Sequence, residues 1–377
     1  SRLTNPTNAA LEARLATLEG GRGCTVASSG HAAQVLALFS LMQPGAEIVA
    51  SSRLYGGSLQ QMRNTYPKFG WKAEIVDADT PDNFKRAVTA NTKAFFIESL
   101  ANPGGVVSDI EAIARIAEDA GVPLLVDNTL ATPYLCKPID YGATLIVHST
   151  TKFLSGTGTS MGGAVVDSGK FDWSVKGSNG GGRFPSLAGP EPAYHGLNFY
   201  ETFGDMAYTF HSHAVGLRDL GPSQAPFNAW LTMLGIETLG LRMERHCANA
   251  ATVAAHLEKH PAVAWVNYAG LPSNKYHQLA KKYLPKGAGS VFTFGVKGGY
   301  DVGVKVVDGV ELFSHLANIG DAKSLIIHPA STTHRQLSDE QRVAAGAGPD
   351  VLRLSIGIET VEDIIADLDQ ALAKATA

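Results

Sequence analysis

The stretches that decide the fold are residues 122–129, VPLLVDNT, and residues 144–153, TLIVHSTTKF. Each begins with a run of mainly apolar residues that hardly alternates with polar ones. Such runs are typical of strands covered on both faces, as in a parallel sheet packed between helices. Polar residues follow each run directly, at the end of the strand where open α/β sheets bind their ligands. The two stretches therefore predict an α/β fold with a binding site at one edge of a mostly parallel sheet.

Helical patterns alternate with short apolar segments around these two stretches. Residues 8–20 are predicted to form a helix that ends at Gly20, and residues 110–120 a helix capped by Asp109. The other strands are expected near 24–28, 48–51, 73–76, 94–98, 164–166, 263–267, 290–296, 324–327 and 351–355. The other helices are expected after Gly30 and at 59–64, 81–88, 228–235, 238–258, 309–317 and 360–374.

The pattern changes along the chain and indicates how it is divided. An N-terminal arm (1–10) precedes a large domain (11–240), and beyond it the alternation gives way to an α+β pattern (241–377). Residues 168–227 are rich in Gly, Pro, Ser and aromatic residues, which predicts a long irregular connection. We expect the large domain to bind the ligand.

Composition excludes several classes of protein. Of the 377 residues, 45% are apolar and 18% are charged, which allows a large core and argues against disorder. The net charge is −4 without a block of like charge, so no nucleic-acid partner and no membrane partner are predicted. The three cysteines are far apart and odd in number, which favours a reducing, cytoplasmic setting. Because the chain opens on Ser1 rather than Met, we expect that it begins inside a longer natural sequence.

The residues that follow the predicted strands form a chemically coherent set. Asp127 supplies a carboxylate and Lys152 an amine, while Ser29-Gly30-His31 begins a helix whose N-terminus favours an anion. Pyridoxal phosphate needs such groups: a lysine for its aldehyde, a carboxylate for its ring nitrogen and a site for its phosphate. The sequence therefore predicts pyridoxal 5'-phosphate as the cofactor, with Lys152 as the Schiff-base lysine and Asp127 facing the ring nitrogen. The predicted phosphate site consists of Gly30, His31, Ser149 and Thr151.

Other interpretations of the same residues are weaker. Taken singly, a strand-end Asp is usually a turn residue, a Gly before a helix belongs to a cap, and a lysine is usually solvated. The motif GxxxxGK[ST] of nucleotide-binding P-loops is absent, and Gly156–Met161 precedes a strand instead of opening a helix. His211 and His213 lack an evident third ligand, so no metal site is predicted.

Almost the whole chain resembles the Cys/Met-metabolism family of pyridoxal-phosphate enzymes, within the aspartate-aminotransferase-like superfamily. That resemblance implies the fold of type I pyridoxal-phosphate enzymes. The stretches that carry it are RLTNPT (2–7), SGHA (29–32), YGG (55–57), ESLANP (98–103), DNT (127–129), STTK (149–152) and LRLSIGIE (352–359).

The resemblance also implies roles that spacing does not indicate. Tyr55 would stack on the cofactor ring and exchange protons with the substrate amine. Asn102 would bond the ring hydroxyl and help to bind substrate, whose carboxylate Arg353 would hold with the help of Ser324. Arg2 would reach the phosphate in a neighbouring subunit, as part of a Tyr-x-Arg clamp whose Tyr would precede Ser1. The family pattern thus implies a homo-oligomer, built as a tetramer from dimers with shared sites.

Within the family, residues 194–204 and 320–334 resemble O-acetylhomoserine sulfhydrylases, and Gly57 stands where methionine γ-lyases have Cys. The expected substrates are O-acetyl-L-homoserine and sulfide or a thiol, in methionine biosynthesis. A methionine or cystathionine γ-lyase and a cystathionine γ-synthase are the alternatives in the same class. A nicotinamide oxidoreductase and a catalytically silent binding protein are alternatives from other classes.

Overall fold

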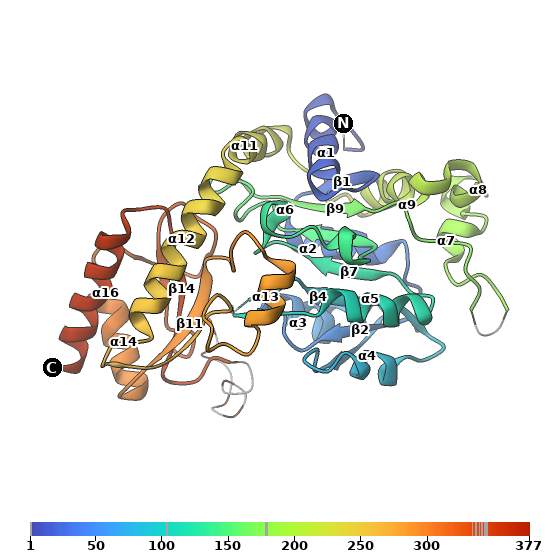
Figure 1. The fold of residues 1–377 in the computed structure, drawn as a ribbon. Coiled ribbons are helices and arrows are strands. Elements are labelled where there is room, and N and C mark those ends of the chain that lie inside the picture. Colours follow the sequence, from blue (N-terminus) through green and yellow to red (C-terminus); the bar gives the residue numbers. More distant parts are fainter. Residues whose placement is uncertain are drawn as a thin grey trace. The chain divides into compact units, whose positions relative to one another are not determined.

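The computed structural model describes residues 2–102, 105–177, 180–333, 335, 338, 340, 342 and 346–377 (Figure 1). It divides into two compact units. The large unit comprises Ser1–Ser99, Ser108–Ser155 and Thr159–Ile236, and the small unit Leu100–Val107, Gly156–Gly158 and Glu237–Ala377. The predicted boundary at 240 lies near the start of the last segment, but the two short segments of the small unit were not predicted. Pro103 and His334, which end two of the motifs, lie outside the described residues.

The large unit is built on a seven-stranded sheet with the order β1-β9-β8-β7-β4-β2-β3. The strands β8, β7, β4, β2 and β3 pair in parallel, and β9 runs antiparallel to both of its neighbours. The predicted, mostly parallel α/β sheet is therefore confirmed. In sheet order the strands are Gly23–Ala27, Gly163–Asp167, Leu145–His148, Leu124–Asp127, Thr92–Glu98, Glu47–Ser51 and Lys72–Val76.

The central strands β4, β7 and β8 are buried almost completely. Alternate residues of these strands, including Phe96, Leu125 and Val147, belong to one apolar core with Ala33 and Leu36 of α2 (Gly30–Phe39). The register places Glu98 opposite Asp127, and Asp127 opposite Val147. The carboxyl ends of the three strands therefore reach the same edge of the sheet.

Local signals in the sequence define several helix ends. Asn5 caps α1 (Pro6–Glu19) by accepting the amide of Asn8, and Gly20 ends it in the left-handed conformation. The predicted cap Asp109 accepts the amide of Ala112 at the start of α5 (Ile110–Asp119). The remaining helices of the first half are α3 (Gly56–Gln60), α4 (Asp82–Ala87) and α6 (Thr132–Leu135).

The region 168–227 has more structure than predicted. It contains short helical segments that gather around aromatic side chains, with Trp173 and Tyr208 stacked at 5.6 Å between ring centroids. Phe184 meets Trp173 edge to face, so aromatic burial orders a segment that lacks helical periodicity. Its α-helices are α7 (Pro185–Ala188), α8 (Phe199–Phe203), α9 (Ala207–His211) and α10 (Arg218–Leu220), and α11 (Pro226–Glu237) follows.

The small unit contains a five-stranded sheet with the order β10-β11-β14-β13-β12. In that order the strands are Val263–Asn267, Val291–Val296, Val351–Ser355, Leu325–Ile327 and Ser314–His315. A separate pair is formed by β5 (Leu100–Ala101) and β6 (Val106–Val107). Its helices are α12 (Leu239–Leu257), α13 (His277–Tyr283), α14 (Gly299–Gly309) and α16 (Val361–Thr376).

The prediction of a helix at residues 309–317 is wrong. The helix α14 ends where it was expected to begin, and the segment continues into the strand β12. Asp367 of α16 explains the difference, because its carboxylate accepts the amides of Glu311, Leu312 and Phe313. These amides are consequently held in a turn by a residue more than fifty positions away.

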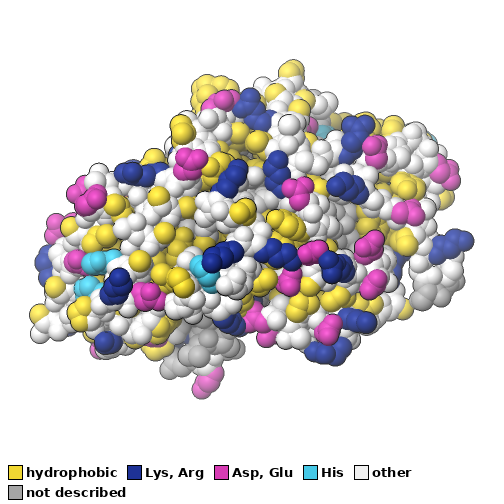
Figure 2. Space-filling view, viewed as in Figure 1, with side chains coloured by type: hydrophobic (Ala, Val, Ile, Leu, Met, Phe, Trp, Pro, Cys, Tyr) yellow, Lys and Arg dark blue, Asp and Glu magenta, His cyan; other side chains and the backbone are white. Residues whose placement is uncertain are grey.

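The distribution of charged side chains on the surface agrees with a sequence that has no block of like charge. Figure 2 shows basic and acidic side chains intermixed on the visible face. Among the described helices, none combines the length and the apolar character that a membrane crossing requires.

Candidate active site

Asp127 and Lys152 leave the same edge of the large sheet. Asp127 is the last residue of β7, and Lys152 follows His148, the last residue of the neighbouring parallel strand β8. The amide of Lys152 donates to the carbonyl of Ser149 at 3.3 Å, in the turn that follows β8. The carboxylate and the amine predicted from sequence therefore lie on adjacent strand ends.

Both oxygens of the Asp127 carboxylate have donors. Its Oδ1 accepts the backbone N–H of Thr129 at 2.9 Å, within the DNT turn. Its Oδ2 accepts the side-chain amide of Gln34 at 3.3 Å. The carboxylate is thus held from its own turn and from α2.

The N-terminus of α2 has the geometry of an anion site. The Ser29 hydroxyl accepts the amide of Ala32 at 3.1 Å, while the amides of Gly30 and His31 have no acceptor within the helix. A Cβ at Gly30 would lie 2.7 Å from the Cβ of Ser149, so glycine allows the segment after β8 to approach this helix end. Ser149 and the first turn of α2 consequently face each other.

Ser149 and Thr151, which were predicted to belong to the phosphate site, have different surroundings. The amide of Ser149 donates to Thr129 Oγ1 at 2.9 Å, which joins the turns after β7 and β8. The Thr151 hydroxyl donates to the carbonyl of Gly162 and accepts its amide, at 3.2 and 3.1 Å. Thr151 therefore also fixes the connection from β8 to β9.

Tyr55 stands at the start of α3, with 48% of its surface exposed. Its amide donates to the Glu98 carboxylate at the end of β4, at 2.6 Å. The Tyr55 ring lies 5.8 Å from that of His31, and a Cβ at Gly57 would collide with both rings. Burial lowers the pKa of His31 against the opposing effect of the Asp127 carboxylate, which favours a neutral imidazole.

A second layer of buried polar groups lies behind this edge. His148 Nε2 lies 2.5 Å from Glu19 Oε1, and both side chains are fully buried. Asn128 donates to the same Glu19 oxygen at 2.8 Å and accepts the Ser99 hydroxyl at 2.7 Å. His148 and Asn128 therefore tie α1 to the residues beside Asp127 and Ser149.

The small unit holds the other predicted side chains. Arg353 on β14 donates from Nη1 to Asn102 Oδ1 at 3.2 Å and from Nη2 to the carbonyl of Asn318 at 3.1 Å. Ser324 is fully buried, and its hydroxyl donates to Glu359 at 3.0 Å and accepts the amide of Gly357 at 2.9 Å. Arg353 and Asn102 are thus brought together, whereas the Ser324 hydroxyl already has partners in the segment that follows β14.

Arg2 lies in the exposed start of the large unit. Its carbonyl accepts the Ser223 hydroxyl at 2.6 Å. The pKa of Asp219 is lowered mainly by its hydrogen bond with Arg218 and to a lesser extent by the charge of Arg2. The first described residue is therefore tied to the segment that precedes α11.

The histidines 211 and 213 do not form a metal site. His211 Nδ1 bonds Ser40 and its Nε2 lies 3.4 Å from Glu191, while His213 lies 3.2 Å from Glu12. Over the residues that the structure describes, no group of three or more His, Cys, Asp or Glu side chains could hold a metal ion. The cysteines Cys24, Cys136 and Cys247 are free and buried, and burial raises the pKa of each.

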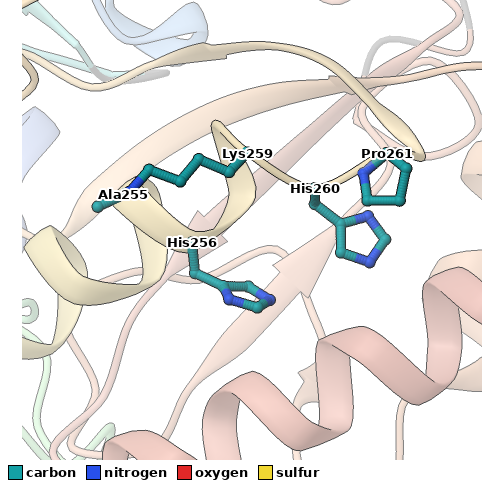
Figure 3. Close-up of a pocket in the computed structure, with 5 residues that line it drawn as sticks. All are labelled: Ala255, His256, Lys259, His260 and Pro261. Carbon is teal, nitrogen blue, oxygen red and sulfur yellow. The ribbon is translucent and has the colours of Figure 1, made fainter.

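A cavity of about 350 Å³ lies elsewhere, beside the end of α12 in the small unit (Figure 3). His256 and His260 line it with Lys259, and His256 Nε2 lies 2.6 Å from Asp369. This cavity lies at the C-terminal end of a helix and lacks the helix N-terminus that the sheet edge offers to an anion. It therefore does not compete with the sheet edge as a cofactor site.

Sequence patterns missed several residues that shape the site. Glu98 was visible as a polar residue at a strand end, but its bond to the Tyr55 amide was not predictable. Gln34, Glu19 and Asn128 are hidden among helix and turn residues, and their contacts arise only from the packing of distant segments.

The residues at the sheet edge fit pyridoxal phosphate. Asp127 offers a held carboxylate, Lys152 lies on the adjacent strand end, and the α2 N-terminus offers free amides beside Ser149. His31 Nε2 is a buried polar atom without a hydrogen-bond partner among the described residues. Such an unpaired atom is costly in a closed core and is expected beside a polar ligand.

Comparison with known proteins agrees with this chemistry. The model of the family described as Cys/Met metabolism PLP-dependent enzyme matches residues 1–373. The chain is 48% identical to an O-acetyl-L-homoserine sulfhydrylase of Leptospira meyeri, over 99% of this chain and 85% of that protein. It is 49% identical to a homocysteine synthase of Schizosaccharomyces pombe, over 99% and 86% of the two chains.

A solved structure from Campylobacter jejuni subsp. jejuni is also similar. It is assigned as an O-acetylhomoserine (thiol)-lyase and contains N'-pyridoxyl-lysine-5'-monophosphate. The match has a TM-score of 0.94 with 43% identity, and covers 99% of this chain and 88% of that one.

The substitution Asp127→Asn tests the carboxylate. An amide cannot hold a positive ring nitrogen by charge, so we expect cofactor retention to weaken by about tenfold or more. Exchange of the substrate α proton should fall further. Equilibrium dialysis and deuterium exchange measure the two effects. Asp119→Asn, at an exposed position of α5, is the matched control, and equal behaviour of the two variants would contradict the role.

Proposed function

Because the chain belongs to the family of Cys/Met metabolism PLP-dependent enzymes, we propose that it transfers sulfide onto O-acetyl-L-homoserine and releases L-homocysteine and acetate. The observation that carries this choice is the near-50% identity, over almost the whole chain, to proteins named for this activity. Family membership sets aside the nicotinamide oxidoreductase considered above. No observation favours a γ-lyase or a cystathionine γ-synthase over the sulfhydrylase.

The large unit supplies the groups for the cofactor. In the proposed arrangement Lys152 joins the aldehyde of pyridoxal phosphate, and Asp127 faces the ring nitrogen. The amides of Gly30 and His31 receive the phosphate, with the hydroxyls of Ser149 and Thr151. Tyr55, which Glu98 holds at its amide, would stack on the ring. The hydrogen bonds of Asp127 to Thr129 and Gln34 support this assignment, because they fix the carboxylate before any ligand arrives.

The reaction then depends on proton transfers by this chain. Bound pyridoxal phosphate supplies a ring that stabilises negative charge at the substrate α carbon. The amine of Lys152, released when the substrate amine takes its place, accepts the α proton and later returns it. Asp127 retains the proton at the ring nitrogen through its negative charge. Tyr55 exchanges a proton with the substrate amine. A second proton would leave the β carbon as acetate leaves the γ carbon, and the β carbon would regain a proton once sulfide has taken that position.

The small unit supplies the groups for the substrate. Arg353 offers a planar guanidinium, which suits a carboxylate. Its bonds to Asn102 and to the Asn318 carbonyl hold the guanidinium in one orientation. Asn102 is proposed to contact both the ring hydroxyl and the substrate. Ser324 would assist only if its hydroxyl left Glu359, so we assign the substrate carboxylate principally to Arg353.

We also propose that the enzyme is a cytoplasmic homo-oligomer, a tetramer built from dimers. The helix α11 supports the assembly, because Phe227, Trp230 and Leu234 are spaced along one face of the helix and about half exposed or more. The three free, buried cysteines support a reducing compartment. In such an assembly Arg2 would contribute to the phosphate site of a neighbouring subunit.

A product assay tests the proposed reaction. With O-acetyl-L-homoserine, acetate release should depend on sulfide and should match the L-homocysteine formed. Little ammonia or 2-oxobutanoate is expected, because a γ-replacement keeps the amino group on the product. In parallel reactions O-succinylhomoserine replaces the acetyl ester, and cysteine or methanethiol replaces sulfide. These reactions define which acyl group and which thiol the enzyme prefers. The formation of 2-oxobutanoate as the main product would show a γ-lyase instead.

Hybrid oligomers test whether Arg2 is shared between subunits. Arg2→Ala should weaken cofactor retention, and Lys152→Ala should abolish turnover. When the two variants are mixed and subunits exchange, one site in each hybrid dimer should hold both groups intact. Activity should then rise above that of either parent. Exchange that is demonstrated by mass spectrometry without such recovery would contradict a shared site.

A further inference from the structure

Gln34 lies on α2, one turn beyond the proposed phosphate site, and is only 2% exposed. Its Nε2 donates two hydrogen bonds, one to the Ser58 hydroxyl at 2.9 Å and one to Asp127 Oδ2 at 3.3 Å. Ser58 is fully buried on α3, close to Tyr55 at the start of that helix. A single side-chain amide therefore connects α2, α3 and the end of β7.

The orientation of this amide is determined by its neighbours. If the amide were flipped, its carbonyl oxygen would face the Asp127 carboxylate, and two acceptors would repel each other. In the observed orientation Gln34 Oε1 is buried without a hydrogen-bond partner among the described residues. A buried acceptor without a partner lowers stability, whereas an apolar side chain of similar length would avoid this cost. The hydrogen bond from Gln34 Nε2 to Asp127 compensates for the cost of the unpaired carbonyl oxygen.

The three connected elements carry three different parts of the proposed cofactor site. The first turn of α2 faces the phosphate, Tyr55 at the start of α3 faces the ring, and Asp127 faces the ring nitrogen. We propose that Gln34 is a positioning residue, which holds the Asp127 carboxylate in place relative to the phosphate and ring sites. This inference rests on the proposed function, because it takes Asp127 as the partner of the cofactor ring.

The titratable groups beside Gln34 are few. On β7 it meets Asp127, and on its own helix His31 lies one turn earlier, with the Tyr55 ring beyond His31. From α3 it meets Ser58, which does not titrate in the accessible range. Gln34 itself is neutral at every pH. A titratable side chain placed at this position therefore adds a pH dependence of cofactor binding that the wild-type protein lacks.

Two substitutions separate positioning from packing. Gln34→Met keeps the length of the side chain but removes the donor, and should weaken cofactor binding by roughly tenfold at every pH. Gln34→Glu keeps the donor only while its carboxyl group is protonated, and a second carboxylate beside Asp127 is unfavourable. Its cofactor dissociation constant should therefore be near that of the wild type at low pH and should rise as the pH increases. Ser58→Ala removes only the bond from Gln34 to α3 and leaves the Asp127 contact intact, so it should weaken cofactor binding less than Gln34→Met does.

The measurements are made on the purified protein loaded with pyridoxal phosphate, between about pH 5.5 and 8.5. The dissociation constant comes from visible absorbance after dialysis, and α-proton exchange gives a second readout that needs no sulfide. Binding within twofold of the wild type for Gln34→Met would overturn the proposal, as would a Gln34→Glu profile parallel to that of the wild type. A wild-type protein that binds cofactor and exchanges the α proton but makes no homocysteine would contradict the proposed reaction and leave the Gln34 comparison valid.

Discussion

The strands β4, β7 and β8 are buried on both faces, and this constraint determines where polar chemistry can lie. A polar side chain in the middle of such a strand would lose its water without gaining a partner. Polar residues are therefore confined to the strand ends, and parallel pairing brings these ends to one edge. Asp127, Lys152 and Glu98 lie at this edge for the same reason. The site is in this sense a consequence of how the core is packed.

The same constraint explains the polar layer behind the edge. Glu19, His148, Asn128 and Ser99 are all buried, and each is acceptable there because it has a partner among the others. Removal of the Glu19 carboxylate would take a partner from both His148 and Asn128 and would destabilise the fold. Because Asn128 and His148 adjoin Asp127 and Ser149 in the chain, the stability of this layer and the geometry of the site depend on the same contacts.

The sequence predicted the features that depend on local patterns. The continuous apolar runs identified the central strands, and Asp109 and Gly20 marked helix ends because caps and left-handed turns have residue preferences of their own. Contacts between distant segments were beyond such patterns. Gln34 and Asp127 are separated by 93 positions, and Glu19 and His148 by 129. The helix expected at 309–317 failed for the same reason, since Asp367 acts on that segment from another helix.

We propose that the carboxyl edge of the large sheet holds pyridoxal phosphate, with the reactive lysine at the end of β8. Borohydride reduction of the loaded enzyme, followed by proteolysis and mass spectrometry, tests it most directly, because reduction fixes the cofactor on the lysine that carries it. We expect the pyridoxyl group on Lys152. Its recovery on any other lysine would show that the end of β8 does not carry the cofactor.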